Sequence, residues 1–431
     1  MAVNSLLSAH EKLCVAVAHS SNASGRGHHH WHVTLQAGAL LRLCGPLSLA
    51  ERLRELELDL RGRATDAVSA KLAKLGDLTQ LDSLQLRGIA IAGSKRLSAA
   101  LSPMTRLSRL LLRFDDDHWM AAQNCTFPWQ SAVCGLTNLQ ELRVTSASES
   151  DYSCLTMFQG ALPAAVSQLS ALRHLEVLGM TEPDEQEDSD RLLLSALPAL
   201  ETASLRLHTL AGQYPGLHQQ RVVLNRLVSL SLALRWDIED DEGEPYQDTR
   251  LPVISAPALT ELTLDDTKLA PDSEQLSWLP QLPKLQRLVL KDVKTASSQL
   301  PSGVMACSGL TELVLERVLV SFSNKPDEVL NRPECRLRSL PAAAPCFAQL
   351  VHLSLSRNAF SAVPPALSKA TALQVLDLAK QKLRDSYVEQ HSAAVQGLRV
   401  LNNLTRLRCL NLEASRKRGL ASAASTRPTR T

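Results

Sequence analysis

The stretch Leu350–Leu378, LVHLSLSRNAFSAVPPALSKATALQVLDL, combines two hydrophobic periods. Leu353 and Leu355 alternate with polar residues, which is typical of a short strand with one buried face. Asn358 follows this alternation, and its amide can bond to free backbone groups in the turn where the chain leaves the strand. A Val-Pro pair then opens a return segment, and the pattern begins again at Leu373. The stretch therefore predicts a strand, a turn and a short return.

The same stretch resembles the leucine-rich repeat family, whose pattern L-x-x-L-x-L-x-x-N-x-L it matches with Phe360 in the last apolar position. The strand start recurs thirteen times, with a mean spacing of about 29 residues, which lies within the range of the family. The thirteen first leucines are Leu53, Leu81, Leu107, Leu139, Leu172, Leu200, Leu227, Leu259, Leu285, Leu310, Leu350, Leu373 and Leu407. Prolines also recur nine residues before the next first leucine, at Pro163, Pro301, Pro341 and Pro364.

The resemblance, which is to intracellular, irregular repeats such as those of plant and algal proteins, implies an α/β solenoid of horseshoe shape with a parallel sheet on its concave face. We expect a repeat domain over residues 46–413, preceded by a non-repeat segment and followed by a disordered basic tail over residues 414–431. The asparagine position is occupied by other residue types in the remaining repeats, for example Thr267, Val293 and Gln381, so no continuous asparagine ladder is expected.

Residues 1–45 do not follow the repeat, and three interpretations stay open. They could form a cap over the first repeat, a transit peptide, or a degenerate F-box-like module. Residues 5–18 favour a helix, and the histidine-rich run over residues 28–32 favours a polar loop rather than a metal site, because no partner ligand lies at suitable spacing.

Composition and motifs argue against several other classes of protein. No apolar run approaches the 18 residues that a membrane helix requires. The nine cysteines are scattered and odd in number, which favours a reducing, cytoplasmic compartment. Phosphate loops, zinc motifs and nucleophile elbows are absent from the sequence, so we expect no catalysis, no metal and no cofactor.

In the family that this chain resembles, the third, fifth and seventh residues of each repeat point onto the concave face. Some of these columns mix charged and apolar residues, as a protein-binding face does, and give the candidates Arg109, Leu111, Arg113, His174 and Glu176. Other columns alternate in charge, with Glu261, Arg287 and Glu312 in one and Asp265, Lys291 and Glu316 in another. Such alternation favours a self-neutralised surface.

A second candidate surface consists of acidic loops. Residues 115–284 hold 10 Lys+Arg against 26 Asp+Glu, a net charge of −16 (10 − 26), concentrated over residues 115–117, 182–190 and 237–244. Aromatic residues accompany these acids, including Phe114 directly before the first run. The candidates are Trp119, Trp236, Asp237, Glu239, Asp240, Asp241 and Tyr246. The loops are either a rim for a basic partner or disordered, solubilising segments, and their charge disfavours nucleic acid.

The sequence therefore predicts a non-catalytic scaffold that binds a protein partner in the cytoplasm, with neither a nucleic acid nor a membrane as partner. The alternative is an F-box-like substrate receptor of a ubiquitin ligase. The resemblance also implies a place in the cytoskeleton, at the cilium axoneme, because some intracellular members of the family associate with that structure.

Overall fold

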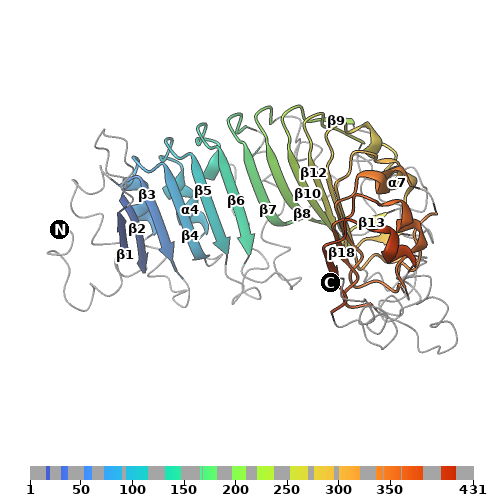
Figure 1. Cartoon of the computed structure of the whole chain (residues 1–431). Coiled ribbons are helices and arrows are strands. Elements are labelled where there is room, and N and C mark those ends of the chain that lie inside the picture. Colours follow the sequence, from blue (N-terminus) through green and yellow to red (C-terminus); the bar gives the residue numbers. More distant parts are fainter. Residues whose placement is uncertain are drawn as a thin grey trace, which may run out of the picture. The chain divides into compact units, whose positions relative to one another are not determined.

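A computed structural model describes residues 16–19, 31–36, 53–60, 72–89, 94–114, 132–146, 166, 168–181, 197–209, 221–236, 253–269, 276–295, 300–320, 336–342, 344–360, 362–381 and 399–413. The chain forms two compact units, Met1–His208 and Thr209–Thr431, which are described separately below. Each unit is built around one sheet with short helices packed against it (Figure 1).

The sheet of unit 1 follows the chain, with strands in the order β1 to β8 (Figure 1). The first two strands are antiparallel, and each later pair of neighbours is parallel. The strands are β1 Ala16–His19, β2 Trp31–Gln36, β3 Glu55–Asp59, β4 Ser83–Ile89, β5 Arg109–Phe114, β6 Glu141–Ser146, β7 His174–Thr181 and β8 Thr202–Thr209. Sequential parallel pairing without crossovers is the arrangement of a solenoid.

The main sheet of unit 2 is also sequential and parallel from β10 onward. Its strands are β10 Ser229–Trp236, β12 Glu261–Asp265, β14 Arg287–Lys291, β16 Glu312–Glu316, β17 His352–Ser354, β18 Val375–Asp377 and β19 Cys409–Asn411. Two small parallel ribbons accompany it, formed by β9 (Arg221–Val223) with β11 (Val253–Ser255) and by β13 (Lys268–Leu269) with β15 (Lys294–Thr295).

The strand positions confirm the predicted repeat register. Each of the thirteen first leucines lies two residues before the start of one of the strands β3–β8, β10, β12, β14 and β16–β19 within the described ranges. Twelve of these leucines are buried, and only Leu407, before the last strand β19, is partly exposed. Each repeat thus contributes leucines to a continuous core, and removing one apolar side chain from water stabilises by about 1.5–3 kcal/mol.

The expectations for the N-terminal segment need two corrections. Residues 16–19 form strand β1 where a helix was predicted, and Trp31 and His32 begin strand β2 where a polar loop was predicted. β2 pairs in parallel with β3, so His32 lies opposite Glu55, and β1 and β2 extend the sheet by two strands before the first repeat. The described part of residues 1–45 therefore lends no support to an F-box-like module, and residues 28–30 lie outside it.

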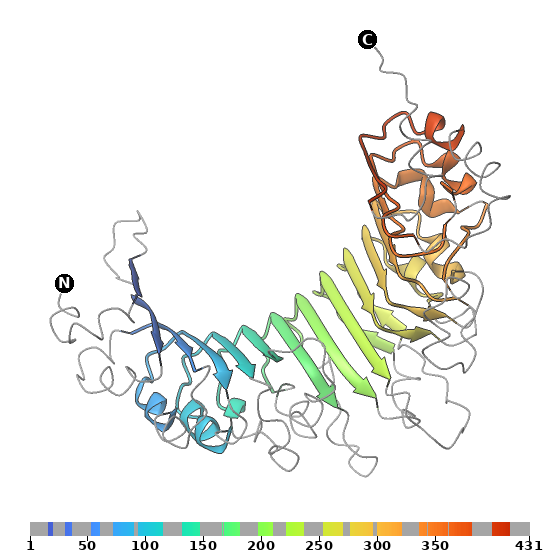
Figure 2. The same cartoon turned by 90° about the horizontal axis from the view of Figure 1, so that it is seen from below.

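Short helices return the chain between strands and lie on one side of each sheet (Figure 2). Pro301 and Pro364 directly precede two of them with φ of −54° and −57°, which explains why proline recurs at this point of the repeat. The helices are η2 Ala73–Asp77, α4 Ser94–Leu101, η8 Leu279–Gln281, α7 Ser302–Ala306, η10 Pro345–Gln349 and η11 Pro365–Lys369.

The eighth residue of the repeat has a left-handed backbone conformation in six repeats. Gly88 has this conformation in unit 1 with φ of 71°. In unit 2 the position is held by residues other than glycine, at Asp266, Asp292, Arg317, Arg357 and Lys380, with φ between 44° and 59°. Each non-glycine residue there costs about 1–2 kcal/mol relative to a right-handed conformation. The turn after the strand is therefore imposed by the surrounding repeat rather than by local preference.

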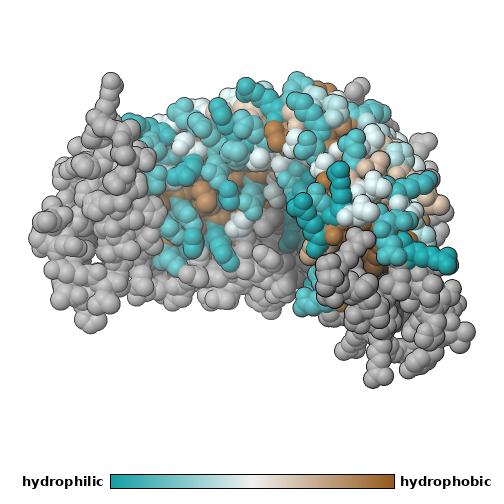
Figure 3. Space-filling model, in the orientation of Figure 1, coloured by the Kyte–Doolittle hydropathy of each residue, from teal (hydrophilic) through white to brown (hydrophobic). Residues whose placement is uncertain are grey.

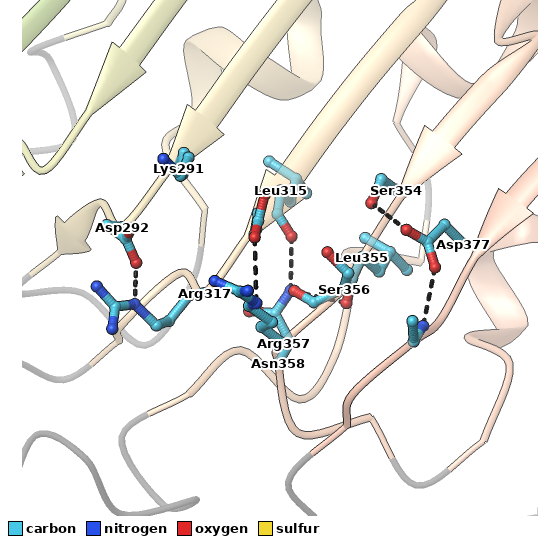
Figure 4. A network of polar contacts seen from close by, with 12 residues as sticks. Lys291, Asp292, Leu315, Arg317, Ser354, Leu355, Ser356, Arg357, Asn358 and Asp377 are labelled. Atoms are coloured by element: carbon cyan, nitrogen blue, oxygen red, sulfur yellow. Dashed lines mark hydrogen bonds and ion pairs between the residues drawn. The ribbon is translucent and has the colours of Figure 1, made fainter. Parts of the chain in front are cut away.

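Asn358, at the ninth position, is fully buried and fills the turn with hydrogen bonds (Figure 4). Its Nδ2 donates to the carbonyl oxygens of Leu315 at 2.6 Å and Leu355 at 2.9 Å, and its Oδ1 accepts from the amide of Val318 at 2.9 Å. The side chain thus bonds to its own turn, as the sequence predicted, and in addition joins that turn to the preceding repeat.

Gln381 occupies the same position in the next repeat and plays the same part. Its Oε1 accepts from the amide of Phe360 at 3.0 Å, and its Nε2 donates to the carbonyl of Leu355 at 2.8 Å. The longer side chain reaches the preceding turn as the asparagine does. Side-chain amides therefore join successive turns in at least two adjacent repeats, whereas the asparagine pattern predicted this for one repeat.

We expect Asn358→Ala to lower the free energy of unfolding by about 1–3 kcal/mol, because alanine leaves the Val318 amide and the Leu315 carbonyl buried without their partner. Urea denaturation followed by circular dichroism measures the loss. Lys369→Ala, an exposed change on helix η11, serves as the control and should be nearly neutral. A loss from Asn358→Ala no larger than that of the control would show that the turn is solvated.

Candidate functional site

The outward face of unit 1 consists of the side chains at the third, fifth and seventh positions of its repeats. In β5 these are Arg109, Leu111 and Arg113, which are exposed or half-buried, while Leu110 and Leu112 between them are buried. Register pairing aligns these positions from strand to strand, about 4.8 Å apart. The predicted assignment of these residues to one open face is confirmed.

Ion pairs cross-link this face. Arg109 pairs with Glu55 at 3.1 Å, reaching across the strand that lies between them. Arg143 on β6 bonds to Glu141 at 2.6 Å and reaches Glu176 on β7 at 3.6 Å. These side chains are all partly exposed, so each pair contributes about 0–1 kcal/mol to stability. Their main effect is to hold the long side chains in place across the sheet.

The candidates on β7 are part of the same arrangement. Glu176 forms an ion pair with Arg143, and Nδ1 of His174 lies 2.8 Å from the hydroxyl oxygen of Thr202 on β8. The strand β6 separates both from the β5 candidates, but Arg143 connects the two groups. The sequence did not single out Arg143, although its fifth position in the repeat places it in the same column as Leu111 and Glu176.

Leu111 and Arg113 differ from their charged neighbours. Arg113 is exposed and makes no hydrogen bond or ion pair among the described residues. Leu111 is half-buried and lies between Gln85 and Arg143 on the adjacent strands. Figure 3 shows apolar surface between hydrophilic side chains on the strand face of unit 1. Leu111 and Arg113, an apolar side chain and a guanidinium without a partner among the described residues, thus lie on a face where Arg109 and Arg143 form ion pairs.

The outward face of unit 2 is more fully neutralised, as the alternating charges predicted. Arg287 pairs with Glu261 and with Glu312 at 3.0 Å, and Glu312 also lies 3.3 Å from Nδ1 of His352. Hydrogen bonding to Glu312 raises the pKa of Arg287 despite partial burial. In the second column, Lys291 pairs with Asp265 at 3.4 Å. These charges satisfy one another and offer a partner little to bind.

The acidic-loop candidates fall mostly outside the described residues. Trp119 and the run from Asp237 to Tyr246 are not described, and of Trp236 only its place at the end of β10 is known. Phe114, which the sequence placed with the loop aromatics, is instead a core residue. It is 1% exposed and lies opposite Ile89 of β4, where the register shifts after Gly88. Phe114 therefore stabilises the fold and does not belong to a binding rim.

Metal ligands, membrane-spanning helices and free cysteines were the remaining features to locate in the described residues. Within the described ranges, no three His, Cys, Asp or Glu side chains come close enough together to hold a metal ion. No helix in that part of the chain is long and apolar enough to cross a membrane. Four described cysteines, Cys134, Cys307, Cys346 and Cys409, are free thiols.

Burial sets the reactivity of these thiols. Desolvation raises the pKa of Cys307 to about 11 and that of Cys346 to about 12, and the negative charge of Cys307, once ionised, adds to the effect at Cys346. The thiol of Cys307 also donates to the carbonyl of Gly303 at 3.1 Å. Neither thiol has the electropositive, accessible surroundings of a reactive cysteine.

We expect iodoacetamide to modify Cys134 and Cys409 in the native protein and to spare Cys307 and Cys346. Shifting the pKa of Cys307 from 9.0 to about 11 lowers its thiolate fraction near neutral pH about 100-fold, and burial blocks access as well. Peptide mass spectrometry after timed labelling measures this, with labelling in urea as the positive control. Equal labelling rates at all four residues would contradict the described burial.

Comparisons with known proteins place the fold in context. No protein-family model matches the chain, and no curated protein matches it. An internalin from Listeria monocytogenes is 15% identical, with 88% of each chain covered and a TM-score of 0.42. A leucine-rich-repeat protein from Leptospira interrogans is 16% identical over 86% of this chain and 97% of its own, with a TM-score of 0.34. The leucine-rich-repeat ectodomain of the Arabidopsis receptor kinase HAESA is 16% identical, with 85% of this chain and 55% of that one covered and a TM-score of 0.40.

Similarities of this size identify no specific relative, so the assignment of the fold depends on the repeat itself. Thirteen described strands begin two residues after the predicted leucines, those of them that are neighbours within a unit pair in parallel, and amides at the ninth position join successive turns. On these grounds the chain has the parallel-sheet solenoid architecture of leucine-rich repeats.

Proposed function

We propose that this chain is a non-catalytic scaffold that binds a protein partner through the outward face of unit 1, with Leu111 and Arg113 at the centre of the contact. The observation that carries the proposal is the exposed guanidinium of Arg113, which has no partner among the described residues and lies on the same strand face as Leu111. Arginine is enriched among the residues that dominate binding energy, and apolar side chains surrounded by polar ones are typical of such contacts.

The rigidity of this face supports the proposal. Strands β4, β5 and β6 are paired residue by residue, and leucines behind them are fully buried. The ion pairs of Arg109 and Arg143 fix two long side chains beside the contact. Binding therefore costs little conformational entropy on this side of the contact, which favours affinity. The chemistry that fits Leu111 and Arg113 is an apolar side chain next to a carboxylate.

Two finer proposals depend on the sequence alone. The scattered cysteines favour the cytoplasm, and the family resemblance implies an association with the cytoskeleton at the axoneme. The acidic runs over residues 115–117, 182–190 and 237–244 would attract a basic segment of a partner, with an association rate that falls as salt increases. These charges also favour a protein over a nucleic acid.

Site-specific photo-cross-linking tests the position of the contact. A benzophenone amino acid in place of Leu111 should capture a partner from a lysate of the cells that produce the protein. The same group in place of Ala99, exposed on helix α4, serves as the control because it projects from the return segment rather than the strand face. Capture from position 111 but not 99 supports the proposal, whereas the same products from both positions, or none from 111, would overturn it.

Once a partner has been captured, we expect Arg113→Glu to weaken its binding at least about tenfold, because the substitution replaces an unpaired cation by an anion at the centre of the contact. Arg96→Glu on helix α4 makes the same charge change away from the strand face. Isothermal titration calorimetry with both variants separates the local contact from the overall charge. Equal losses for the two variants would assign the effect to net charge.

A further inference from the structure

Three arginines of unit 2 gather beyond the carboxyl ends of β16 and β17. Arg317 follows β16 directly, and Arg357 lies three residues after β17, both at the left-handed eighth position of their repeats. Figure 4 shows these two at the ends of neighbouring strands. Arg336 joins them from the long insertion of the tenth repeat, where it pairs with Leu319 in an isolated antiparallel bridge. We call Arg317, Arg336 and Arg357 the arginine cluster.

Backbone contacts hold Arg336 firmly in this position. The amide of Leu337 donates to the carbonyl of Val318 at 3.0 Å, and the amide of Ala359 donates to the carbonyl of Leu337 at 3.0 Å. The segment at Arg336 is thereby fixed between the turns of two successive repeats. Its guanidinium Nη1 donates to the carbonyl oxygen of Arg357. The side chain is therefore placed by the fold and not by a flexible end.

Arg336 is a buried cation that forms no ion pair with any residue in the described ranges. Its residue is only 3% exposed, and its Nε is a buried donor with no acceptor in the described part of the chain. Desolvation lowers the pKa of Arg336, and the nearby charges of Arg317 and Arg357 lower it further. Burying an unpaired charge is costly, so a fold that retains one at a fixed position requires an explanation.

The arginine cluster and its two acidic partners carry an excess of positive charge. Arg317 pairs with Asp292, and Arg357 pairs with Glu316 at 3.3 Å. Three positive charges against two negative ones leave a net charge of +1 (3 − 2) among these five residues. The side chains of Arg317 and Arg357 are 42% and 44% exposed, so solvent reaches two of the three guanidinium groups.

We propose that the arginine cluster is a binding site for a single oxyanion, a carboxylate or a phosphate, that is held between the exposed guanidinium groups of Arg317 and Arg357, beside the buried positive charge of Arg336. Planar guanidinium groups suit the geometry of such anions better than that of a spherical halide, and charge-assisted hydrogen bonds of this kind are among the stronger ones in proteins. One negative charge would neutralise the cluster. This site lies in unit 2 and is independent of the face proposed for protein binding in unit 1.

Thermal unfolding of the full chain in increasing sodium phosphate or sodium acetate, with sodium chloride added to keep the ionic strength constant, tests the site. An anion that binds the native state raises Tm with a dependence that saturates at its Kd. We expect such a saturable rise with at least one of the two anions and none when sodium chloride replaces it. The stronger anion identifies whether the site favours a phosphate or a carboxylate.

Variants connect the effect to the cluster. Arg336→Gln should abolish the anion-dependent rise in Tm, and Arg317→Gln or Arg357→Gln, which change exposed residues and leave the core intact, should weaken the apparent affinity about tenfold. Arg287→Gln, an arginine of the same unit paired with Glu261 and Glu312, serves as the control and should retain the rise. The proposal is overturned if neither anion stabilises more than chloride, or if the response of the Arg317 and Arg357 variants equals that of the unsubstituted protein.

Discussion

Replacing Leu353 by aspartate is expected to abolish the cooperative unfolding transition of unit 2 at 25 °C. Leu353 is fully buried in β17, between Leu313 of β16 and Leu376 of β18. Loss of the leucine alone costs about 2–5 kcal/mol, and burying a carboxylate without a partner adds several more. The sum approaches the whole stability of a typical domain, about 5–15 kcal/mol. Circular dichroism during heating and urea titration measures the transition.

Two controls make this result specific to the repeat register. Leu353→Met keeps the apolar volume and should cost less than about 1.5 kcal/mol. His352→Asp places the same charge on the outward face of the same strand, next to Glu312, and should cost about 1 kcal/mol or less. A melt of Leu353→Asp that coincides with that of His352→Asp would mean that the alternation of faces has been assigned incorrectly.

Gly303→Ala should destabilise unit 2 by about 3 kcal/mol or more, although alanine is the better helix former by about 1 kcal/mol. Gly303 lies in helix α7, where a β-carbon would come within 1.8 Å of the carbonyl oxygen and 2.5 Å of the carbonyl carbon of Leu276. Both are backbone atoms, so no rotation of a side chain can relieve the clash. The helix would have to move away from the preceding repeat and open the core between them.

Gly309→Ala is the matched control. A β-carbon at Gly309 would lie 3.4 Å from the carbonyl oxygen of Leu285, which is close to ordinary contact, so this change should alter the free energy of unfolding by less than about 1 kcal/mol. Urea denaturation of the two variants gives the difference directly. If Gly303→Ala were neutral or stabilising, helix α7 would not pack as closely on the preceding repeat as described.

The sequence predicts the strand stack because one residue type at fixed spacing carries it. A leucine at the first position with alternating leucines after it can satisfy only one register, and a slip by one residue would expose them all. For the same reason Arg109, Leu111 and Arg113 could be placed on one face, and the ion pairs of Arg287 could be read from the alternating charges of its column. Such features can be predicted because they depend only on which residues occupy the same position in adjacent repeats.

Features that depend on single residues were not predictable in the same way. Gln381 replaces an asparagine because its extra methylene spans the turn, which a pattern of residue types does not reveal. The strand β1 was predicted as a helix, since a short apolar run fits both periods when no partner strand is known. Phe114 was assigned to a loop because the shift of register after Gly88 is visible only in three dimensions.

The candidate sites show the same division. The β5 and β7 residues follow from the repeat period, but the connection through Arg143 depends on how long side chains extend between strands. The position of Arg336 depends on the path of the longest insertion, whose end returns to Leu319. No local pattern marks an arginine as buried and unpaired, so the cluster could not be found before the turns were placed.

The ion pair between Glu55 and Arg109 has a consequence for how this array could change during evolution. Ser83 lies between the two residues on β4, so the pair couples the first and third repeats over about 10 Å of sheet. Repeat proteins grow and shrink by copying or losing whole units, and their energetics are usually described by adjacent units alone. Here, copying the second repeat would move the two charges out of reach of each other, and losing it would press them onto adjacent strands. The order of these three units is thus favoured by the contribution of one partly exposed ion pair, about 0–1 kcal/mol.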